Sequence, residues 1–133
     1  MNIVVLISGS GTNLQAIIDG IEAGAIDGQI VAVISNRPNV KGLERAQQHG
    51  IETLLLDHTQ FETREAFDAE LQQRIEHYQP DLVVLAGFMR ILTDAFVDHF
   101  TGRMLNIHPS LLPKYKGLNT HQRALDAHEA QHG

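Results

Sequence analysis

The chain has 133 residues, of which 43% are hydrophobic and 20% charged, with a net charge of -6 and no cysteine. This composition indicates an ordinary globular protein and excludes disulfides and thiolate zinc sites, and it argues against a nucleic-acid partner, whose phosphates need concentrated Lys and Arg. There is no signal-peptide pattern, and no apolar stretch reaches the ~18 residues of a membrane span, so we expect a cytoplasmic protein without a membrane partner.

Short apolar runs alternate with amphipathic segments along the chain. The apolar runs are rich in β-branched residues and predict buried strands at residues 3–7, 30–34, 53–56, 82–86 and 103–107. The amphipathic segments predict helices around residues 14–21, 42–49, 67–78, 94–100 and 120–128. This alternation predicts a Rossmann-like, mostly parallel open α/β sheet with helices on both faces.

The helix ends carry recognisable capping residues. Thr12 or Asn13 can cap the first helix, and Gly24 lies where that helix should stop. Gly50 is a suitable residue to follow the second helix, and Thr63 is expected to cap the third. These signals set the approximate bounds of the helices.

Charged residues of the third helix are expected on its solvated face, among them Asp68, Glu70 and Glu76. Arg64 lies in the first turn, where a cation is poorly placed for the helix dipole. That makes Arg64 a candidate for binding an acidic ligand, although a solvated surface arginine fits the same position.

We expect residues 1–133 to form a single α/β domain. A doubly wound sheet would normally continue with another strand after a helix at 120–128, so the domain is expected to be truncated at its C-terminal end. An unpaired sheet edge at that place would favour aggregation or a homodimer.

Residues 8–13, SGSGTN, join the first strand to the first helix, and we call them the glycine loop. Glycines allow close backbone approach, and a helix N-terminus attracts anions, so a phosphate would be well placed here. A dinucleotide fingerprint would need glycine in place of Leu14 and an acid near Ser35 and Asn36. The loop therefore predicts a phosphomonoester site, or else a tight turn that uses glycine only for geometry.

Residues 87–92, GFMRIL, follow the fourth strand without a polar turn, and we call them the apolar loop. Connections are normally polar, so this loop can line a pocket for a flat, largely apolar ligand. The alternative is that Phe88, Ile91 and Leu92 simply fill the core.

Asn106 and His108 lie two residues apart at the end of the fifth predicted strand, so their side chains should share one face. Pro109 keeps His108 extended. An amide donor beside a titratable imidazole suits a reaction with a tetrahedral oxyanion. The other histidines near the C-terminus match no zinc-ligand spacing, so we expect no metal site.

Three segments together resemble the folate-dependent phosphoribosylglycinamide formyltransferases. They are residues 7–15 (ISGSGTNLQ), 85–92 (LAGFMRIL) and 106–115 (NIHPSLLPKY). The resemblance covers this whole chain but only the N-terminal part of a family-length one. It implies a formyltransferase-type domain and transfer of a formyl group from 10-formyltetrahydrofolate to the amine of glycinamide ribonucleotide, in purine synthesis and without a metal.

The resemblance also implies roles for particular residues. Those expected to hold the ribonucleotide phosphate are Gly11, Thr12 and Asn13. Those expected to contact the folate are Arg64, Met89, Arg90, Ile91, Leu92 and Asn106. Asn106 would also donate to the formyl oxygen, and His108 would act as the general acid. The family's aspartate that pairs with this histidine would lie beyond Gly133.

Two alternatives remain beside the transferase. One is a hydrolase of 10-formyltetrahydrofolate, which would have no phosphorylated acceptor for the glycine loop to hold. The other is a catalytically incomplete fragment that only binds ligand, because the aspartate and part of the folate pocket would be absent.

Overall fold

A computed structural model describes residues 1–107, and residues 108–133 lie outside the described part. The sheet is formed by β1 (Asn2–Ile7), β2 (Gln29–Ser35), β3 (Thr53–Leu55), β4 (Leu82–Ala86) and β5 (Met104–Ile107). The helices are α1 (Thr12–Glu22), α2 (Lys41–Gln48), α3 (Arg64–His77) and α4 (Asp94–His99), with a short 3₁₀ helix, η1, at His58–Gln60. The five strands and the four α-helices match the predicted elements to within a few residues, whereas η1 was not predicted. The helix predicted at 120–128 lies outside the described residues.

The five strands pair in the order β3-β2-β1-β4-β5, and each neighbouring pair is parallel. The chain first moves outward from β1 to β3 and then returns to the other side of β1 with β4 and β5. This order creates a switch point between β1 and β4, where the loops that leave the two strands diverge. In open α/β sheets a ligand crevice forms at such a point, beyond the carboxyl ends of the strands.

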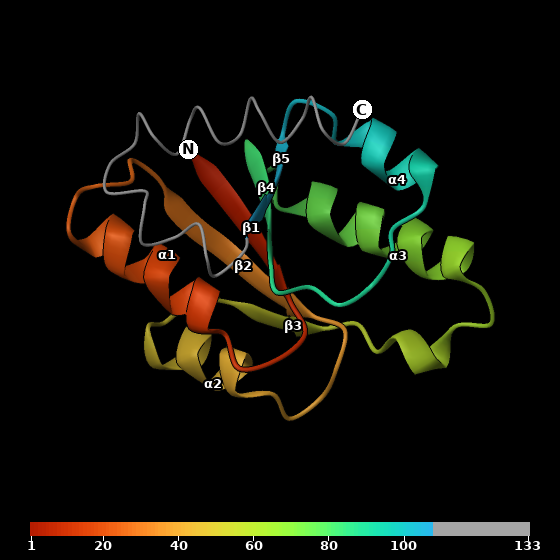
Figure 1. Cartoon of the computed structure of the whole chain (residues 1–133), viewed down its shortest axis with the longest axis horizontal. Helices are drawn as coiled ribbons and strands as arrows, with labels where there is room; N and C mark the ends of the chain where they lie inside the picture. Colours follow the sequence, from red (N-terminus) through yellow and green to blue (C-terminus); the bar gives the residue numbers. More distant parts are fainter. Residues whose placement is uncertain (108–133) are drawn as a thin grey trace.

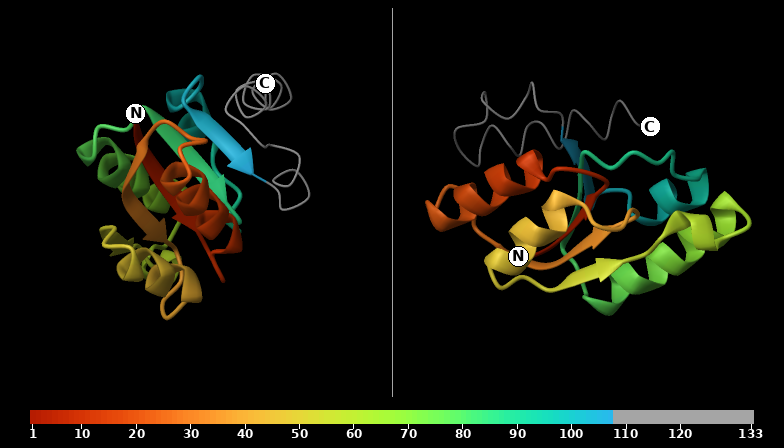
Figure 2. Two further views of the ribbon diagram at one scale, coloured as in Figure 1. Left: turned by 90° about the vertical axis from the view of Figure 1, so that its left-hand side faces the viewer. Right: turned by 90° about the horizontal axis from the view of Figure 1, so that it is seen from below.

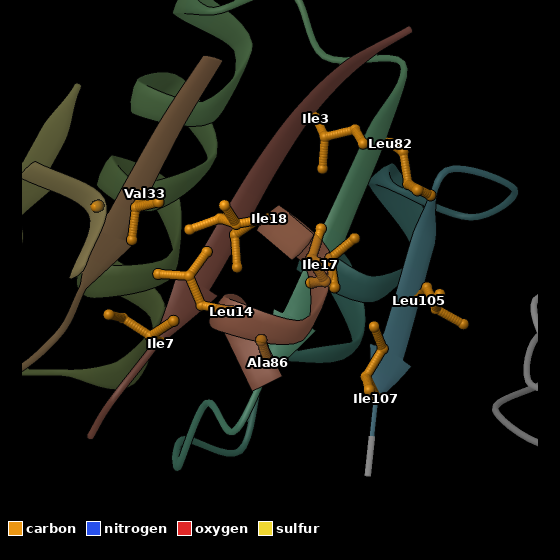
Figure 3. Packing of buried hydrophobic residues seen from close by; sticks show 13 residues of the cluster. Ile3, Ile7, Leu14, Ile17, Ile18, Val33, Leu82, Ala86, Leu105 and Ile107 are labelled. Atoms are coloured by element: carbon orange, nitrogen blue, oxygen red, sulfur yellow. The ribbon is translucent and has the colours of Figure 1, made fainter. Parts of the chain in front are cut away.

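Helices cover both faces of the sheet, as predicted, with α1 and α2 on one side and α3 and α4 on the other (Figures 1 and 2). Because successive strand residues point to opposite faces, β1 contributes Ile3, Val5 and Ile7 to one core and Val4 and Leu6 to the other. Figure 3 shows the first core, in which Leu14, Ile17 and Ile18 of α1 lie over the sheet. The second is built around Phe67, Leu71 and Ile75 of α3.

The predicted cap of α1 was wrong. The N-cap residue is Gly11, with φ +78°, and no side chain within residues 1–107 caps the helix. The other end follows expectation, because Gly24 has φ +80° directly after the last turn. The predicted cap of α3 is confirmed, since Thr63 Oγ1 accepts a hydrogen bond of 3.0 Å from the N–H of Ala66.

The prediction that Asp68 lies on a solvated face was also wrong, because only 3% of its surface is exposed. Asp68 directly follows Phe67 and lies beneath the segment that joins β4 to α4, where its carboxylate accepts a hydrogen bond from Thr93. None of the helices within residues 1–107 is both long and apolar enough to cross a membrane.

Candidate active site

The glycine loop packs against the first turn of α2. A Cβ on Gly11 would lie 2.5 Å from the Cα of Gly42, so only glycine fits at this crossing. The N–H of Gly42 donates to the Gly9 carbonyl over 3.1 Å, and Arg45 Nε donates to the Ser10 carbonyl over 2.8 Å. The sequence did not reveal Gly42, although a glycine inside a short helix costs about 1 kcal/mol of helix propensity and was a usable signal.

The N-terminus of α1 has the features of an anion site. Its first turn contains no acidic residue and receives no side-chain cap from the described residues, so within them the positive end of the helix dipole is not compensated. The Arg45 guanidinium adds a positive charge beside the loop, through its contact with the Ser10 carbonyl. These features favour the phosphate interpretation of the loop over a purely geometric turn.

Asn13 connects the glycine loop to β5. Its side chain is buried, and Nδ2 donates to the carbonyl oxygen of Ile107 over 3.4 Å. The amide group is therefore directed at the strand end that carries Asn106, while the backbone N–H of Asn13 stays in the first turn of α1. His108 follows Ile107 in sequence but lies outside the described residues, so its expected proximity to Asn106 is not tested.

Asn106 is half-buried near the end of β5, in register with Leu85 of β4. Its neighbours Leu105 and Ile107 belong to the core beneath α1, and Leu85 and Met104 belong to the core beneath α3. Asn106 therefore faces the α3 side of the sheet. The apolar loop lies on that same side, because two of its residues pack on that core.

The apolar loop divides between core and surface. Phe88 and Leu92 pack against the core beneath α3, as the core-filling interpretation predicted. Met89 and Ile91 are instead 77% and 72% exposed, so that interpretation was wrong for Ile91. Between them, the guanidinium carbon of Arg90 lies 4.9 Å from the centre of the Phe67 ring. Two exposed apolar side chains beside a cation form a surface suited to a flat, partly charged ligand.

Arg64 is exposed at the first position of α3. Helical residues three and four apart share a face, so Arg64 lies one turn from Phe67 and Asp68, which both contact the segment after β4. Arg64 is thus beside the candidate ligand surface. It forms no hydrogen bond or ion pair within residues 1–107, which leaves its charge available for an acidic group.

A buried polar network, which the sequence did not reveal, crosses the switch point. Ser8 Oγ donates to Asn36 Oδ1 over 2.5 Å and accepts from the N–H of Met89 over 2.8 Å. Asn36 also contacts His58 Nδ1, through its side-chain nitrogen at 3.3 Å and its carbonyl oxygen at 3.1 Å. The network joins the ends of β1, β2 and β4 with the start of η1.

Next to this network, Asp57 accepts hydrogen bonds from the hydroxyl and N–H of Thr59, which hold the pKa of its carboxyl below the usual 3.8. This carboxylate caps η1, so its role is to fix the turn that carries His58. No group of three or more His, Cys, Asp or Glu side chains in the described part of the chain is arranged to hold a metal ion.

Comparison with known proteins gives one consistent result. A family model described as formyl transferase matches residues 1–133. The phosphoribosylglycinamide formyltransferase of Escherichia coli is 59% identical over 133 residues, which are all of this chain and 63% of the relative. The human trifunctional purine biosynthetic protein adenosine-3 is 48% identical over 93% of this chain and 12% of its own length.

The same likeness appears among solved structures. The phosphoribosylglycinamide formyltransferase of Coxiella burnetii is 61% identical, with a TM-score of 0.79 over 96% of this chain and 60% of that structure. Glycinamide ribonucleotide transformylase 1 of Symbiobacterium toebii is 49% identical, with a TM-score of 0.78 over the same shares. The chain therefore has the fold of these enzymes and spans somewhat less than two thirds of their length.

Proposed function

The chain belongs to the formyl transferase family, and from this premise we propose that the protein transfers a formyl group from 10-formyltetrahydrofolate to the amine of glycinamide ribonucleotide. The observation that carries the proposal is that the glycine loop, the apolar loop and the end of β5 meet beyond the carboxyl ends of β1 and β4. The glycine loop contacts the apolar loop through Ser8 and Met89, and it contacts the end of β5 through Asn13 and Ile107. An acceptor held at the first loop and a donor held at the second would both lie beside Asn106.

On the acceptor side, the ribonucleotide phosphate binds at Gly11, Thr12 and Asn13. The uncompensated N-terminus of α1 and the nearby Arg45 supply the positive potential that a phosphate needs. Because the Asn13 side chain is directed at Ile107, we assign its contact with phosphate to the backbone N–H. The phosphate then fixes the rest of the ribonucleotide relative to β5.

On the donor side, the folate lies against the apolar loop. Met89 and Ile91 present exposed apolar surface suited to the flat pterin, and Leu92 closes the loop against the core. Arg90 and Arg64 supply positive charge for the acidic part of the folate. The chemistry of these side chains therefore fits a ligand that is aromatic at one end and anionic at the other.

In the transfer step, the acceptor amine forms a bond to the formyl carbon, and the bond from that carbon to the folate nitrogen breaks. Asn106 donates its amide hydrogen to the formyl oxygen as negative charge develops there. His108 acts as the general acid, so that the departing folate nitrogen gains a proton while the amine loses one. The reaction uses no metal ion and takes place in the cytoplasm, with these two small molecules as partners.

The domain organisation belongs to the same proposal, with residues 1–133 in one formyltransferase-type domain. The hydrolase alternative is not favoured, because the relatives are named as transferases and because the glycine loop suits a phosphorylated acceptor. A hydrolase would release formate without the ribonucleotide, whereas the proposed transferase needs it for turnover.

The test is formyl transfer by the whole protein, measured with and without glycinamide ribonucleotide. We expect His108→Ala to lower kcat by about 10²–10⁴-fold with ligand affinities retained, as is typical of a lost general acid. The matched control is His77→Ala, which removes an exposed histidine at the end of α3. The 133-residue chain is assayed in parallel, because an incomplete fragment would bind ligand without turnover. Near-normal transfer by His108→Ala would remove this residue from the mechanism.

A further inference from the structure

The apolar loop is held by two side chains that come from other elements. Within residues 1–107, the backbone of residues 88–92 makes one hydrogen bond, from the N–H of Met89 to Ser8 Oγ at 2.8 Å. Directly after the loop, the N–H of Thr93 donates to Asp68 Oδ2 at 2.7 Å. One side-chain acceptor therefore lies near each end of the loop, which otherwise rests on apolar contacts of Phe88 and Leu92.

Ser8 is well placed to fix the start of the apolar loop. Only 1% of its surface is exposed, and its hydroxyl is used twice, as a donor to Asn36 Oδ1 and as the acceptor for Met89. Donation to Asn36 fixes the direction of the hydroxyl hydrogen, which leaves a lone pair for Met89. The glycine loop itself is held independently of this hydroxyl, through the bonds from Gly42 and Arg45 to its carbonyl groups.

Asp68 fixes the end of the apolar loop, and its burial there lowers the stability of the fold. It is 97% buried in α3, and its second oxygen, Oδ1, has no hydrogen-bond partner among residues 1–107. A buried carboxylate with an unpaired oxygen is a poor source of stability compared with an apolar side chain of similar volume. The Arg90 guanidinium lies over the ring of the neighbouring Phe67, and Arg90 Nε is likewise buried with no hydrogen-bond partner in the described part of the chain. Both unpaired atoms thus belong to the attachment of the apolar loop to α3.

We propose that Ser8 and Asp68 are positioning residues that hold the apolar loop in the shape that binds the folate. The inference rests on the proposed function, because it assigns the loop to the formyl donor. Each residue acts through a backbone N–H of the segment and not by touching the reacting atoms. Their removal should therefore weaken folate binding and leave ribonucleotide binding nearly intact.

The test compares Ser8→Ala, Asp68→Ala and Asp68→Asn in the whole protein. Calorimetry gives the Kd for tetrahydrofolate and, separately, the Kd for glycinamide ribonucleotide. We expect each alanine variant to raise the tetrahydrofolate Kd by about threefold to tenfold, the effect of one lost hydrogen bond, with the ribonucleotide Kd within about twofold. Asp68→Asn keeps an acceptor oxygen for Thr93 and should restore most of the affinity.

Hydrogen exchange gives a readout that does not depend on the proposed activity. The amide of Met89 should exchange faster in Ser8→Ala, and that of Thr93 in Asp68→Ala. The control is Thr101→Ala, a substitution between α4 and β5 that removes a hydroxyl bonded to the Val97 carbonyl of α4 and should change neither Kd.

The outcomes separate the two proposals. Faster amide hydrogen exchange at the loop with an unchanged tetrahydrofolate Kd would overturn the positioning role. An equal rise in the Kd of both ligands would overturn it as well. Should Ser8→Ala fail to fold, the comparison of Asp68→Ala with Asp68→Asn decides alone. Wild-type protein that binds tetrahydrofolate but transfers no formyl group would contradict the proposed function, while the exchange and Kd results would still decide the role of Ser8 and Asp68.

Discussion

Gly42 is a residue outside the glycine loop at which a single added methyl group should disturb the candidate site directly. A Cβ at this position would overlap Ile7 Cδ1 and would lie 3.0 Å from the Gly9 carbonyl oxygen and 3.2 Å from Gly11 Cα. Ile7 is fully buried and cannot swing away, and the other two atoms are backbone of the glycine loop. In Gly42→Ala, therefore, the glycine loop or α2 must move.

The expected magnitude follows from two opposing terms. Alanine is favoured over glycine inside a helix by about 1 kcal/mol. An extra methyl in a packed interior costs about 1–3 kcal/mol, and the upper end applies here because backbone atoms must shift. The net loss of stability is therefore about 2 kcal/mol. Displacement of the loop should also weaken binding of glycinamide ribonucleotide, since the phosphate site that we propose is made from the backbone of this loop.

Urea denaturation measures the first effect and calorimetry the second. The matched control is Gln48→Ala, an exposed substitution at the last position of the same helix, which should change stability by less than about 0.5 kcal/mol. A Gly42→Ala protein that is as stable as wild type and binds the ribonucleotide with unchanged Kd would refute the close-packing argument.

Three further predictions concern single side chains. Asn13→Ala leaves the Ile107 carbonyl without its donor, so we expect a stability loss of about 1 kcal/mol by urea denaturation together with a lower kcat. Arg103 and then His99 lower the pKa of Glu76, so its pairing stabilises the protein above the unfolded value of 4.5 and is lost as pH falls through the lower folded-state pKa. In urea denaturation, Glu76→Gln should lower the free energy of unfolding by about 0.5 kcal/mol at neutral pH and leave it unchanged in strong acid. An equal loss at both pH values would contradict the pairing. Burial and a 2.6 Å hydrogen bond to Glu52 raise the pKa of Tyr78 to about 12. Ultraviolet titration should therefore show a tyrosine that ionises near pH 12, and Tyr78→Phe should remove this transition. The stability that the neutral phenol contributes should be lost as pH rises from 10 towards 12.

The sequence predicted the elements well because hydrophobic periodicity reports directly on burial within a strand or helix. Prediction from periodicity was less reliable for a residue at the boundary between the buried and the exposed face of a helix. Asp68 directly follows Phe67 and precedes Leu71 by three positions, so periodicity alone leaves its side of α3 undecided. Similarly, a polar residue at the start of a helix is normally expected to cap that helix. The side chain of Asn13 instead donates to the Ile107 carbonyl, which lies nearby only because of the strand order.

The sequence by itself determined the succession of strands and helices, the glycine loop at the end of the first strand, and the amide of Asn106 near the end of the fifth. Each of these depends on residues close together in the chain. The tertiary structure alone decided which loops meet, because β1 lies between β2 and β4 and so brings Ser8 to Met89, 81 positions away, and Asn13 to Ile107, 94 positions away. Hydrogen bonds over such separations depend on strand order and on the packing of both sheet faces. Local sequence patterns predict neither of these.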